Sequence, residues 1–502
     1  MNTTTDRPDG GELIARTLKA AGVERVFALH GGHLEAFYRG CNRHQLELID
    51  FRHEASAGHA AEGYARATGR LGVCVVTAGP GYLNVLTAAV NANLDGVPTL
   101  FIVGAPPLRE AEFSSLQGGF DQIAMAAPGV KWAHRITNTE RVPDLIAMAI
   151  RKATTGRRGA VLIEVPIDVM HIPVDESEVM PPAGLNTHPR PAPAPAELAA
   201  ALALLKAAKR PAIVCGSEAR FAQCEGDLRA FAEASGIPVF VNLRAFGMLP
   251  WDHPLYGSET SNLAALQASG KAGPDTFLLL GARASMSLGG RRNAILPGGA
   301  KLIQVLANAE EIGRMRDIDV PIVADCGSAL QALIGATAGV AWPDWSAWTR
   351  QAVDMKNAHG RIHKEADTGG GVHPYHASLA VVEAAGPDAS YILDGSEARI
   401  WAGHAVRVNG PGQFVSNGYL GLLGAGMGLA IGAQYARPAA RVVQIASDGA
   451  VGFHLQDFDT MVRRKLPIVT VVLNNRIWGM SLHGQQMLYG KDYESRFADM
   501  MG

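Results

Sequence analysis

Short, uninterrupted apolar runs alternate with amphipathic helical segments along most of the chain, and this alternation restricts the fold more than any other feature. Between residues 10 and 178, runs such as GVCVVTAG, PTLFIVGA and AVLIEVP follow helical stretches such as ELIARTLKAAG. A strand that is apolar at every position is buried on both faces. Such strands occur where helices cover both sides of a parallel sheet. The pattern therefore predicts an α/β protein.

The chain is long enough for several domains of this kind, because 502 residues exceed what one hydrophobic core usually serves. The alternation occurs three times, which predicts three successive α/β domains with parallel sheets. The proline-dense stretch VMPPAGLNTHPRPAPAPAEL is typical of an extended linker. We expect an N-terminal domain over residues 1–178, a linker over 179–198, a central domain over 199–340 and a third domain over 341–502.

Charge and composition exclude several functions. The 45 Lys and Arg residues against 47 Asp and Glu residues give a formal charge of -2, which offers no basic surface for nucleic acid or an acidic membrane. The five cysteines never show a metal-ligand spacing and are expected to be reduced core residues. The first residues lack the apolar core of a signal peptide, so we expect a cytoplasmic protein that acts on a small molecule.

One segment, residues 418–436, is uncharged and long enough to span a bilayer. About half of it is Gly and Ala, which favours a close-packed helix buried in a protein core. We therefore expect no membrane span.

Polar side chains follow two apolar runs near the end of the chain. RVVQIA leads into Ser447-Asp448-Gly449, and VTVVL leads into Asn474-Asn475. Two parallel strands would bring Asp448 and Asn475 to the same carboxyl edge of a sheet. Hard oxygen ligands suit Mg²⁺ or Ca²⁺, and a neighbouring helix N-terminus suits a phosphate. The pattern predicts a diphosphate held through a divalent metal, although an isolated Asp-Gly pair more often marks a turn.

With the paired asparagines, this segment resembles the GDG…NN signature of the thiamine diphosphate-dependent enzymes, the family of acetolactate synthase and pyruvate decarboxylase, and the resemblance covers nearly the whole chain. It implies thiamine diphosphate and Mg²⁺ as cofactors. The metal ligands would be Asp448, the Asn475 side chain and the Ile477 carbonyl. Ser447 stands where the family usually has glycine.

The resemblance also assigns the other cofactor contacts. Glu54, in FRHEASAGHAAEGYARATG, would hydrogen-bond the aminopyrimidine ring and so activate the cofactor. The alternative is an ordinary acid in the first turn of a helix, favoured by the helix dipole. Leu423 would be the apolar wedge that bends the cofactor, or simply a core residue. The remaining contacts would come from Thr77, Pro80, Asn84, Gly395, Ser396, Gly421, Gly449, Ala450, Trp478 and Gly479.

Within the family, the first domain most closely resembles benzaldehyde lyase, which cleaves and forms acyloins without an oxidant or a 2-keto acid. GGELIARTLKAAGVERVFALHGGHLEAFY and LQGGFDQIAMAAPGVKWAHR carry this resemblance. It implies that His33 and Gln117 face the reacting carbonyl, where a histidine can transfer protons near neutral pH. Alternatively, His33 caps its helix and Gln117 satisfies loop backbone.

The departures from benzaldehyde lyase concentrate in the expected substrate pocket. Arg399, Asn417, Ile167 and Met480 replace a tyrosine, a histidine, a tryptophan and an alanine. Arg399 carries a fork suited to carboxylate or phosphate, unless it is merely an exposed helical arginine. Met480 narrows the pocket while remaining adaptable. These residues predict a narrower, more polar pocket for short aliphatic or anionic substrates.

We therefore expect a carbon–carbon lyase or ligase that cleaves or forms 2-hydroxy ketones from aldehydes. The alternatives are a 2-keto acid-decarboxylating carboligase of the acetolactate synthase type, a 2-hydroxyacyl-CoA lyase and a cofactor-binding pseudoenzyme. The resemblance further implies a homodimer or homotetramer with sites between subunits. In the central domain Leu306 and Ala307 replace the usual acid, so we expect no bound nucleotide there. Because the family continues with another helix and strand, the C-terminal end is expected to be incomplete.

Overall fold

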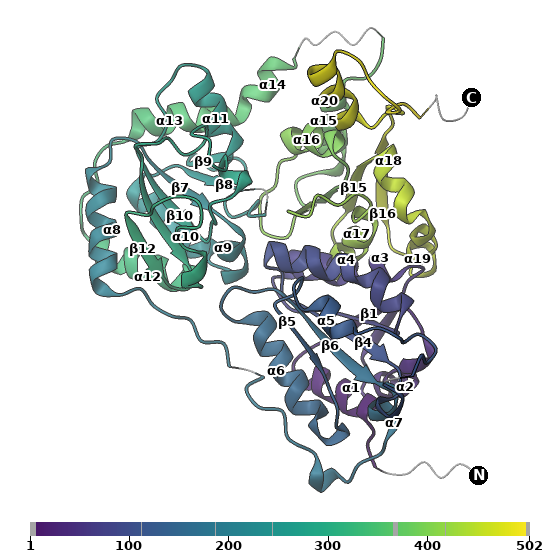
Figure 1. The fold of residues 1–502 in the computed structure, drawn as a ribbon. Coiled ribbons are helices and arrows are strands. Elements are labelled where there is room, and N and C mark those ends of the chain that lie inside the picture. The colour runs from purple at the N-terminus through teal and green to yellow at the C-terminus, as the bar shows by residue number, and fades with distance from the viewer. Residues whose placement is uncertain are drawn as a thin grey trace. The chain divides into compact units, whose positions relative to one another are not determined.

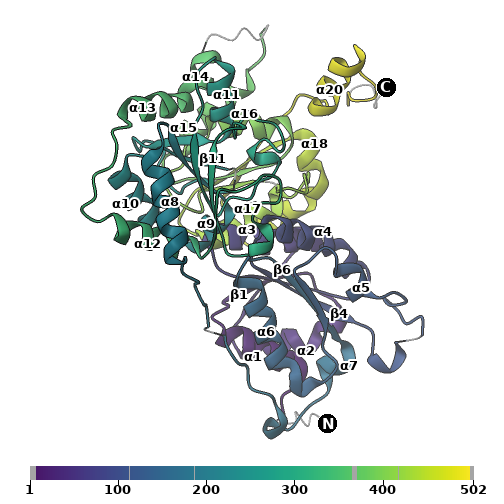
Figure 2. The same cartoon turned by 60° about the vertical axis from the view of Figure 1, so that its left-hand side comes forward.

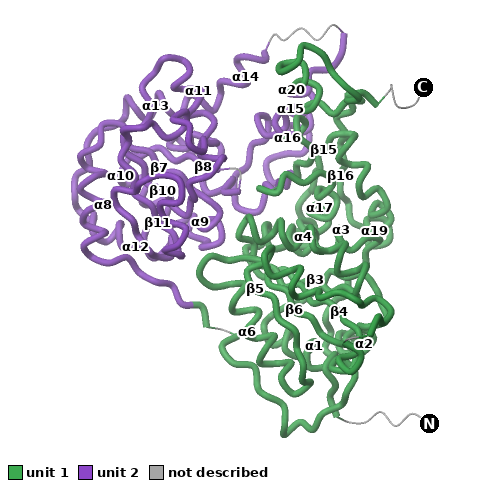
Figure 3. Tube along the Cα trace, viewed as in Figure 1, with its two compact units in different colours: residues 1–188, 392–399, 417–502 green, residues 189–391, 400–416 purple. Residues whose placement is uncertain are grey.

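Strands and helices alternate along the whole chain, as the apolar pattern predicts (Figure 1). The strands form three sheets, and the α/β fold with parallel strands is confirmed. The chain divides into two compact units, one of residues 1–188, 392–399 and 417–502 and the other of residues 189–391 and 400–416 (Figure 3). The computed structural model describes residues 7–111, 113–185, 187–242, 244–364, 370–416 and 418–497.

The first sheet has six strands within the described residues, in the order β2-β1-β3-β4-β6-β5, and all of its neighbours pair in parallel. Figures 1 and 2 show α1, α2 and α6 on one face of this sheet and α3 and α4 on the other. The strands are β1 Arg25–Ala28, β2 Glu47–Asp50, β3 Gly72–Val76, β4 Thr99–Ala105, β5 Trp132–Arg135 and β6 Ala160–Pro166. The helices are α1 Gly10–Ala20, α2 Glu35–Arg43, α3 Glu54–Thr68, α4 Pro80–Asp95, α5 Gln122–Ala126, α6 Val142–Thr154 and α7 Ile167–His171.

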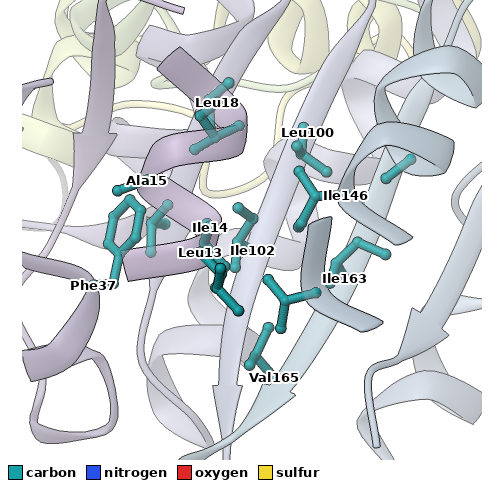
Figure 4. Close-up of a cluster of buried hydrophobic side chains, with 14 of the residues drawn as sticks. Leu13, Ile14, Ala15, Leu18, Phe37, Leu100, Ile102, Ile146, Ile163 and Val165 are labelled. Atoms are coloured by element: carbon teal, nitrogen blue, oxygen red, sulfur yellow. The ribbon is translucent and has the colours of Figure 1, made fainter. Parts of the chain in front are cut away.

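The core of this domain lies between α1, α6 and the central strands. Leu13, Ile14 and Leu18 of α1 are fully buried, and they belong to one cluster with side chains of β4 and β6 (Figure 4). Strands β3, β4 and β6 are buried at every position. This explains why they read as continuous apolar runs, because helices cover both of their faces.

The second sheet also has six parallel strands within the described residues, in the order β12-β11-β10-β7-β8-β9. Its first helix begins at Pro195, inside the segment 179–198 that we expected to be a linker. The strands are β7 Pro211–Cys215, β8 Val239–Val241, β9 Tyr256–Glu259, β10 Thr276–Leu280, β11 Lys301–Leu306 and β12 Val320–Val323. The helices are α8 Pro195–Ala207, α9 Ser217–Ala222, α10 Glu225–Ser235, α11 Ser261–Ala268, α12 Cys326–Thr337, α13 Ser346–Asp354, α14 Ala358–Ile362 and α15 Pro374–Ala385.

The third sheet has the order β14-β13-β15-β16 within the described residues, and β15 and β16 pair in parallel. Its strands are β13 Ser390–Leu393, β14 Phe414–Ser416, β15 Val442–Ser447 and β16 Ile468–Leu473. Its helices are α16 Glu397–Ala405, α17 Gly426–Ala436, α18 Asp448–Val451, α19 Phe458–Arg463 and α20 Gly479–Tyr489.

Helix α17 packs closely against α3, so the small-residue segment is a buried helix from Gly426 onwards, as predicted, whereas residues 418–425 form no helix. A β-carbon added at Gly428 would lie 2.5 Å from the Ser56 carbonyl oxygen, and one at Gly432 would overlap the backbone of Ala60. None of the described helices is long and apolar enough to cross a membrane. The five cysteines are buried and form no disulfide, as expected of reduced core residues.

Candidate active site

The two halves of the metal motif meet at the carboxyl ends of β15 and β16. Ser447 is the register partner of Leu473, the last residue of β16. The Ser447 hydroxyl caps α18 by accepting a hydrogen bond from the Ala450 N–H at 3.2 Å. Asp448 Oδ2 accepts one from the Arg476 N–H at 3.0 Å. The carboxylate on one strand thus contacts the turn that follows the other.

Asp448 has the chemistry that a divalent cation requires. Its Oδ1 is buried, and no residue in the described ranges donates a hydrogen bond to it. A buried carboxylate oxygen without a donor costs free energy unless a cation neutralises it. Among the described residues, Asn475 Oδ1 accepts only a 3.2 Å hydrogen bond from the Ile477 N–H, within its own turn. The side chains of these two residues therefore fit a hard cation such as Mg²⁺.

Glycines keep this edge of the sheet open. Gly395 has a φ of 94°, and a β-carbon there would lie 2.5 Å from Ser447 Oγ. A β-carbon at Gly449 would lie 2.6 Å from the Trp478 ring, and one at Gly479 would overlap the Glu397 carboxylate. All three glycines are among the expected cofactor contacts, and a side chain at any of them would displace its neighbours. Ser396, which is exposed, directly precedes helix α16.

Asp394 is a residue that sequence reasoning missed. It is fully buried at the end of β13, and its carboxylate accepts hydrogen bonds from the N–H groups of Gly395 at 2.6 Å, Gly424 at 3.3 Å and Gly426 at 2.7 Å. It thereby anchors the loop that contains Gly421 and Leu423. The Asp-Gly pair in YILDGSEA was a signal that could have found it.

Glu54 opens α3 and is only 9% exposed. Its Oε2 accepts a hydrogen bond from Asn84 Nδ2 at 2.9 Å. Its Oε1 faces Gly81, where a β-carbon would lie 3.5 Å away. Pro80 is the first residue of α4, which carries Asn84. Thus Pro80 and Asn84, which the family resemblance assigns to the cofactor contacts, lie on a helix that contacts the carboxylate.

His33 is linked to the same region through Thr77, whose side chain lies near Gly81. Its Nδ1 is 3.0 Å from the Thr77 hydroxyl oxygen. Burial, together with the charge of His171, lowers the pKa of His33. The side chain caps no helix, because the caps of the two helical segments around it are Gly31 and Leu34, neither of which uses a side chain.

Gln117 lies against the loop that precedes α4. Its φ is 60°, in the left-handed region, and its Cα would be 2.9 Å from a β-carbon at Gly79. Within the described ranges its side chain makes no hydrogen bond to loop backbone, unlike Gln122, which sequence reasoning missed. Gln122 Oε1 accepts from the Gly79 N–H at 2.9 Å, and its Nε2 donates to Glu164 at 2.9 Å.

A cavity of about 360 Å³ opens next to Gln117. Its lining includes the side chains of Gln117, Gln122, Arg135 and Glu164. Ile167 directly follows the cavity residue Pro166 and begins α7. No single residue in the sequence signals this cavity, because its lining comes from three strand ends and one loop.

The other expected pocket residues lie on different elements. Arg399 is half-buried in the first turns of α16. Met480, in the first turn of α20, is 53% exposed. Asn417 lies outside the described residues.

Comparison with known proteins assigns the family. The chain matches the thiamine pyrophosphate enzyme family over three regions: the N-terminal TPP binding domain over residues 8–125, the central domain over 198–333 and the C-terminal TPP binding domain over 394–500. The match to two TPP binding domains supports thiamine diphosphate as the cofactor.

Individual relatives match along almost the whole chain. It is 32% identical over 483 residues to a probable acetolactate synthase of Mycobacterium bovis, covering 96% of this chain and 86% of the relative. It is 31% identical over 508 residues to 2-hydroxyacyl-CoA lyase 2 of Homo sapiens, covering 93% and 79%. A probable acetolactate synthase large subunit of Methanocaldococcus jannaschii is 29% identical over 498 residues. The chain therefore belongs to the thiamine pyrophosphate enzyme family.

Proposed function

We propose that this protein is a thiamine diphosphate-dependent carbon–carbon lyase or ligase that cleaves or forms 2-hydroxy ketones from aldehydes. The observation that carries the proposal is the buried Glu54 carboxylate beside Asn84, with the His33 imidazole next to Thr77 in the same domain. An acid against the cofactor ring and a neutral imidazole near the carbonyl are the two groups that this chemistry requires.

Thiamine diphosphate, when bound, supplies a nucleophilic carbon that adds to carbonyl groups. Asp448, Asn475 and the Ile477 carbonyl would hold Mg²⁺ and, through it, the diphosphate. Glu54 would hydrogen-bond the aminopyrimidine ring, and Asn84 holds one of its oxygens in place. Leu423 would support the bent shape of the cofactor.

His33 would transfer the proton when a carbonyl becomes a hydroxyl or the reverse. Its lowered pKa keeps the imidazole neutral near pH 7, so it can accept a proton from a substrate hydroxyl. The Thr77 hydroxyl, 3.0 Å from Nδ1, fixes the ring so that Nε2 is free to exchange that proton. Gln117, which lines the cavity, would orient the substrate hydroxyl or a water.

For substrate, we propose a short aliphatic or anionic carbonyl compound, with Arg399 pairing with the anion and Met480, Ile167 and Asn417 shaping the pocket. We also propose a homo-oligomer, a dimer or a tetramer, with Glu54 of one subunit completing the site of its partner.

A second candidate is supported by the relatives. Proteins named acetolactate synthase and 2-hydroxyacyl-CoA lyase match over more than nine-tenths of this chain. Both a 2-keto acid and an acyl-CoA carry anionic groups that the Arg399 guanidinium could bind. In this alternative, carbon–carbon cleavage releases carbon dioxide or an acyl-CoA fragment.

Proton NMR distinguishes these reactions. The protein is given thiamine diphosphate and Mg²⁺, with formaldehyde, acetaldehyde, benzaldehyde, pyruvate or a 2-hydroxyacyl-CoA in separate samples. Acyloin from an aldehyde alone supports the lyase or ligase, whereas product only from pyruvate, with carbon dioxide, or only from the thioester supports the second candidate.

Two variants test the catalytic assignment. Glu54→Gln should lose turnover and retain cofactor binding. Glu35→Gln, which changes an exposed first-turn acid of α2, should leave turnover unchanged. Wild-type turnover in Glu54→Gln would refute the role of that residue, and no product in any wild-type sample would favour the pseudoenzyme.

A further inference from the structure

A largely buried ionic network joins helix α3 to the end of helix α4. The side chains of Glu62 and Asp95 are 0% exposed, and that of Arg66 is 9% exposed. Arg66 Nε donates to Glu62 Oε1 at 3.0 Å, and Arg66 Nη2 donates to Asp95. Asn91 Nδ2 donates to Glu62 Oε1 at 2.8 Å, and His59 Nδ1 lies 3.1 Å from Glu62 Oε2.

This arrangement is costly for a contact between two helices. Each ion taken from water costs several kcal/mol before pairing, and apolar residues of similar size often stabilise such a position equally well. Burial works to raise the pKa of Glu62, yet the charges of Arg66 and His59 keep it below its usual value. The network therefore stays ionised.

The network reaches a loop of the third domain. Asp95 Oδ1 accepts a hydrogen bond from the Tyr419 N–H at 3.0 Å. A β-carbon at Gly418 would overlap Asp95 Oδ2, so the backbone lies directly against the carboxylate. Tyr419 opens the stretch that leads through Gly421 and Leu423 to Gly424.

The far end of the same loop is held by Asp394, which binds the N–H groups of Gly424 and Gly426. Two buried carboxylates, one from α4 and one from β13, therefore fix the two ends of the loop. A short loop held at both ends loses most of its conformational freedom before any ligand binds, which lowers the entropic cost of binding.

We propose that Asp95 is a positioning residue that holds the 418–424 loop, and with it Leu423, in place for thiamine diphosphate. The proposal rests on the proposed function only in taking Leu423 as a cofactor contact. Arg66 orients Asp95, and the helix that carries Arg66 begins at Glu54. The helix that begins at the activating acid thus also orients the carboxylate that holds this loop.

The test uses the full chain without and with cofactor. In Asp95→Ala, hydrogen exchange of the peptide that contains Tyr419 should accelerate in the cofactor-free protein. The Kd for thiamine diphosphate at saturating Mg²⁺ should rise about tenfold or more, as expected for the loss of a buried, charge-assisted hydrogen bond. Leu18→Ala, in the core on the other face of the sheet, is the control for lost stability and should change neither quantity.

A second variant keeps every charge. Gly418→Ala should also raise the Kd, because the new methyl group meets Asp95 Oδ2. In the double variant Asp95→Ala/Gly418→Ala, the Kd should rise by less than the two single effects combined, because the nearest obstacle is gone and only Asn91 Oδ1, at 2.8 Å, still crowds the new methyl group. If one of the two single variants folds poorly, the double variant can still be compared with the other.

Neither readout requires turnover, so failure of this proposal is distinguishable from failure of the proposed function. Unchanged exchange at Tyr419 in Asp95→Ala, or faster exchange with an unchanged Kd, would overturn the proposal. A wild-type protein that binds thiamine diphosphate but converts no substrate would overturn the proposed function, whereas a raised Kd in Asp95→Ala would still support the role of Asp95.

Discussion

Replacing Gly395 with alanine should damage both the stability of the protein and its cofactor site. Gly395 has a φ of 94°, and alanine in a left-handed conformation costs about 1–2 kcal/mol. The new β-carbon would also lie 2.5 Å from Ser447 Oγ and 3.0 Å from Ser447 Cβ. Overpacking of this kind adds about 1–3 kcal/mol. We therefore expect a loss of about 2–5 kcal/mol in the free energy of unfolding, as the sum of the strain and overpacking costs.

The effect on cofactor binding follows from what Ser447 does. Its hydroxyl caps α18, whose first residue is Asp448, so displacing Ser447 moves the carboxylate assigned to the metal. The Kd for thiamine diphosphate, measured by calorimetric titration with Mg²⁺, should rise in Gly395→Ala.

Gly22→Ala is the matched control. Gly22 has a φ of 76°, and a β-carbon there meets no atom within 4 Å. Gly22→Ala should therefore lose only the part of the free energy of unfolding that comes from backbone strain, and it should leave the Kd for thiamine diphosphate unchanged. The double variant Gly395→Ala/Ser447→Gly should regain part of the stability, because the overlapping side-chain atoms are gone. If urea unfolding showed Gly395→Ala to be no less stable than Gly22→Ala, with an unchanged Kd, the close approach of Gly395 to Ser447 would be refuted.

Three further predictions concern the metal ligand and two histidines. Asp448→Asn keeps the shape of the side chain but removes its charge. The Mg²⁺-dependent affinity for thiamine diphosphate should therefore fall by more than about 100-fold, because even residues that only support a metal ligand contribute about 10–100-fold to metal affinity. A wild-type affinity in calorimetry would contradict the assignment of Asp448 as a metal ligand. Because the pKa of His33 lies below 6.5, the acid limb of the pH–rate profile should have its midpoint below pH 6.5 and be absent in His33→Ala, and a midpoint above 6.5 would assign the limb to another group. Burial, helped by the stacked His404 ring, lowers the pKa of His359 to about 4. The folded protein therefore keeps this ring neutral while the unfolded chain protonates it near 6.5, so stability should be complete above pH 6.5 and fall as the pH drops from 6.5 to about 4. Urea unfolding should show that the free energy of unfolding falls less with decreasing pH in His359→Gln than in the wild-type protein. An equal fall in the two proteins would exclude His359 as a source of the pH dependence.

Much of the architecture could be predicted from the sequence because it depends on local patterns. A strand with an apolar run such as GVCVV buries its side chains only where helices cover both faces of the sheet, and β3 is buried at every position. The Asp448 and Asn475 pair could be predicted to meet because parallel strands align their carboxyl ends, and the Arg476 N–H does bind Asp448. The family assignment follows from the same motifs and agrees with the three matching domains.

The tertiary structure alone decided which polar residues hold the site together. Asp95 and Gln122 have no periodic or motif signal, and Asp394 has only an Asp-Gly pair, since a buried carboxylate or amide is defined by donors that come from distant parts of the chain. The Tyr419 N–H that binds Asp95 is 324 positions away in sequence. Likewise, Gly395 could be recognised as part of a turn, but its approach to Ser447 depends on β13 and β15 lying side by side. The local sequence determines which helices and strands form. Contacts between distant helices, strands and loops set the positions of the reacting groups, because only packing brings their donors and acceptors within hydrogen-bonding distance.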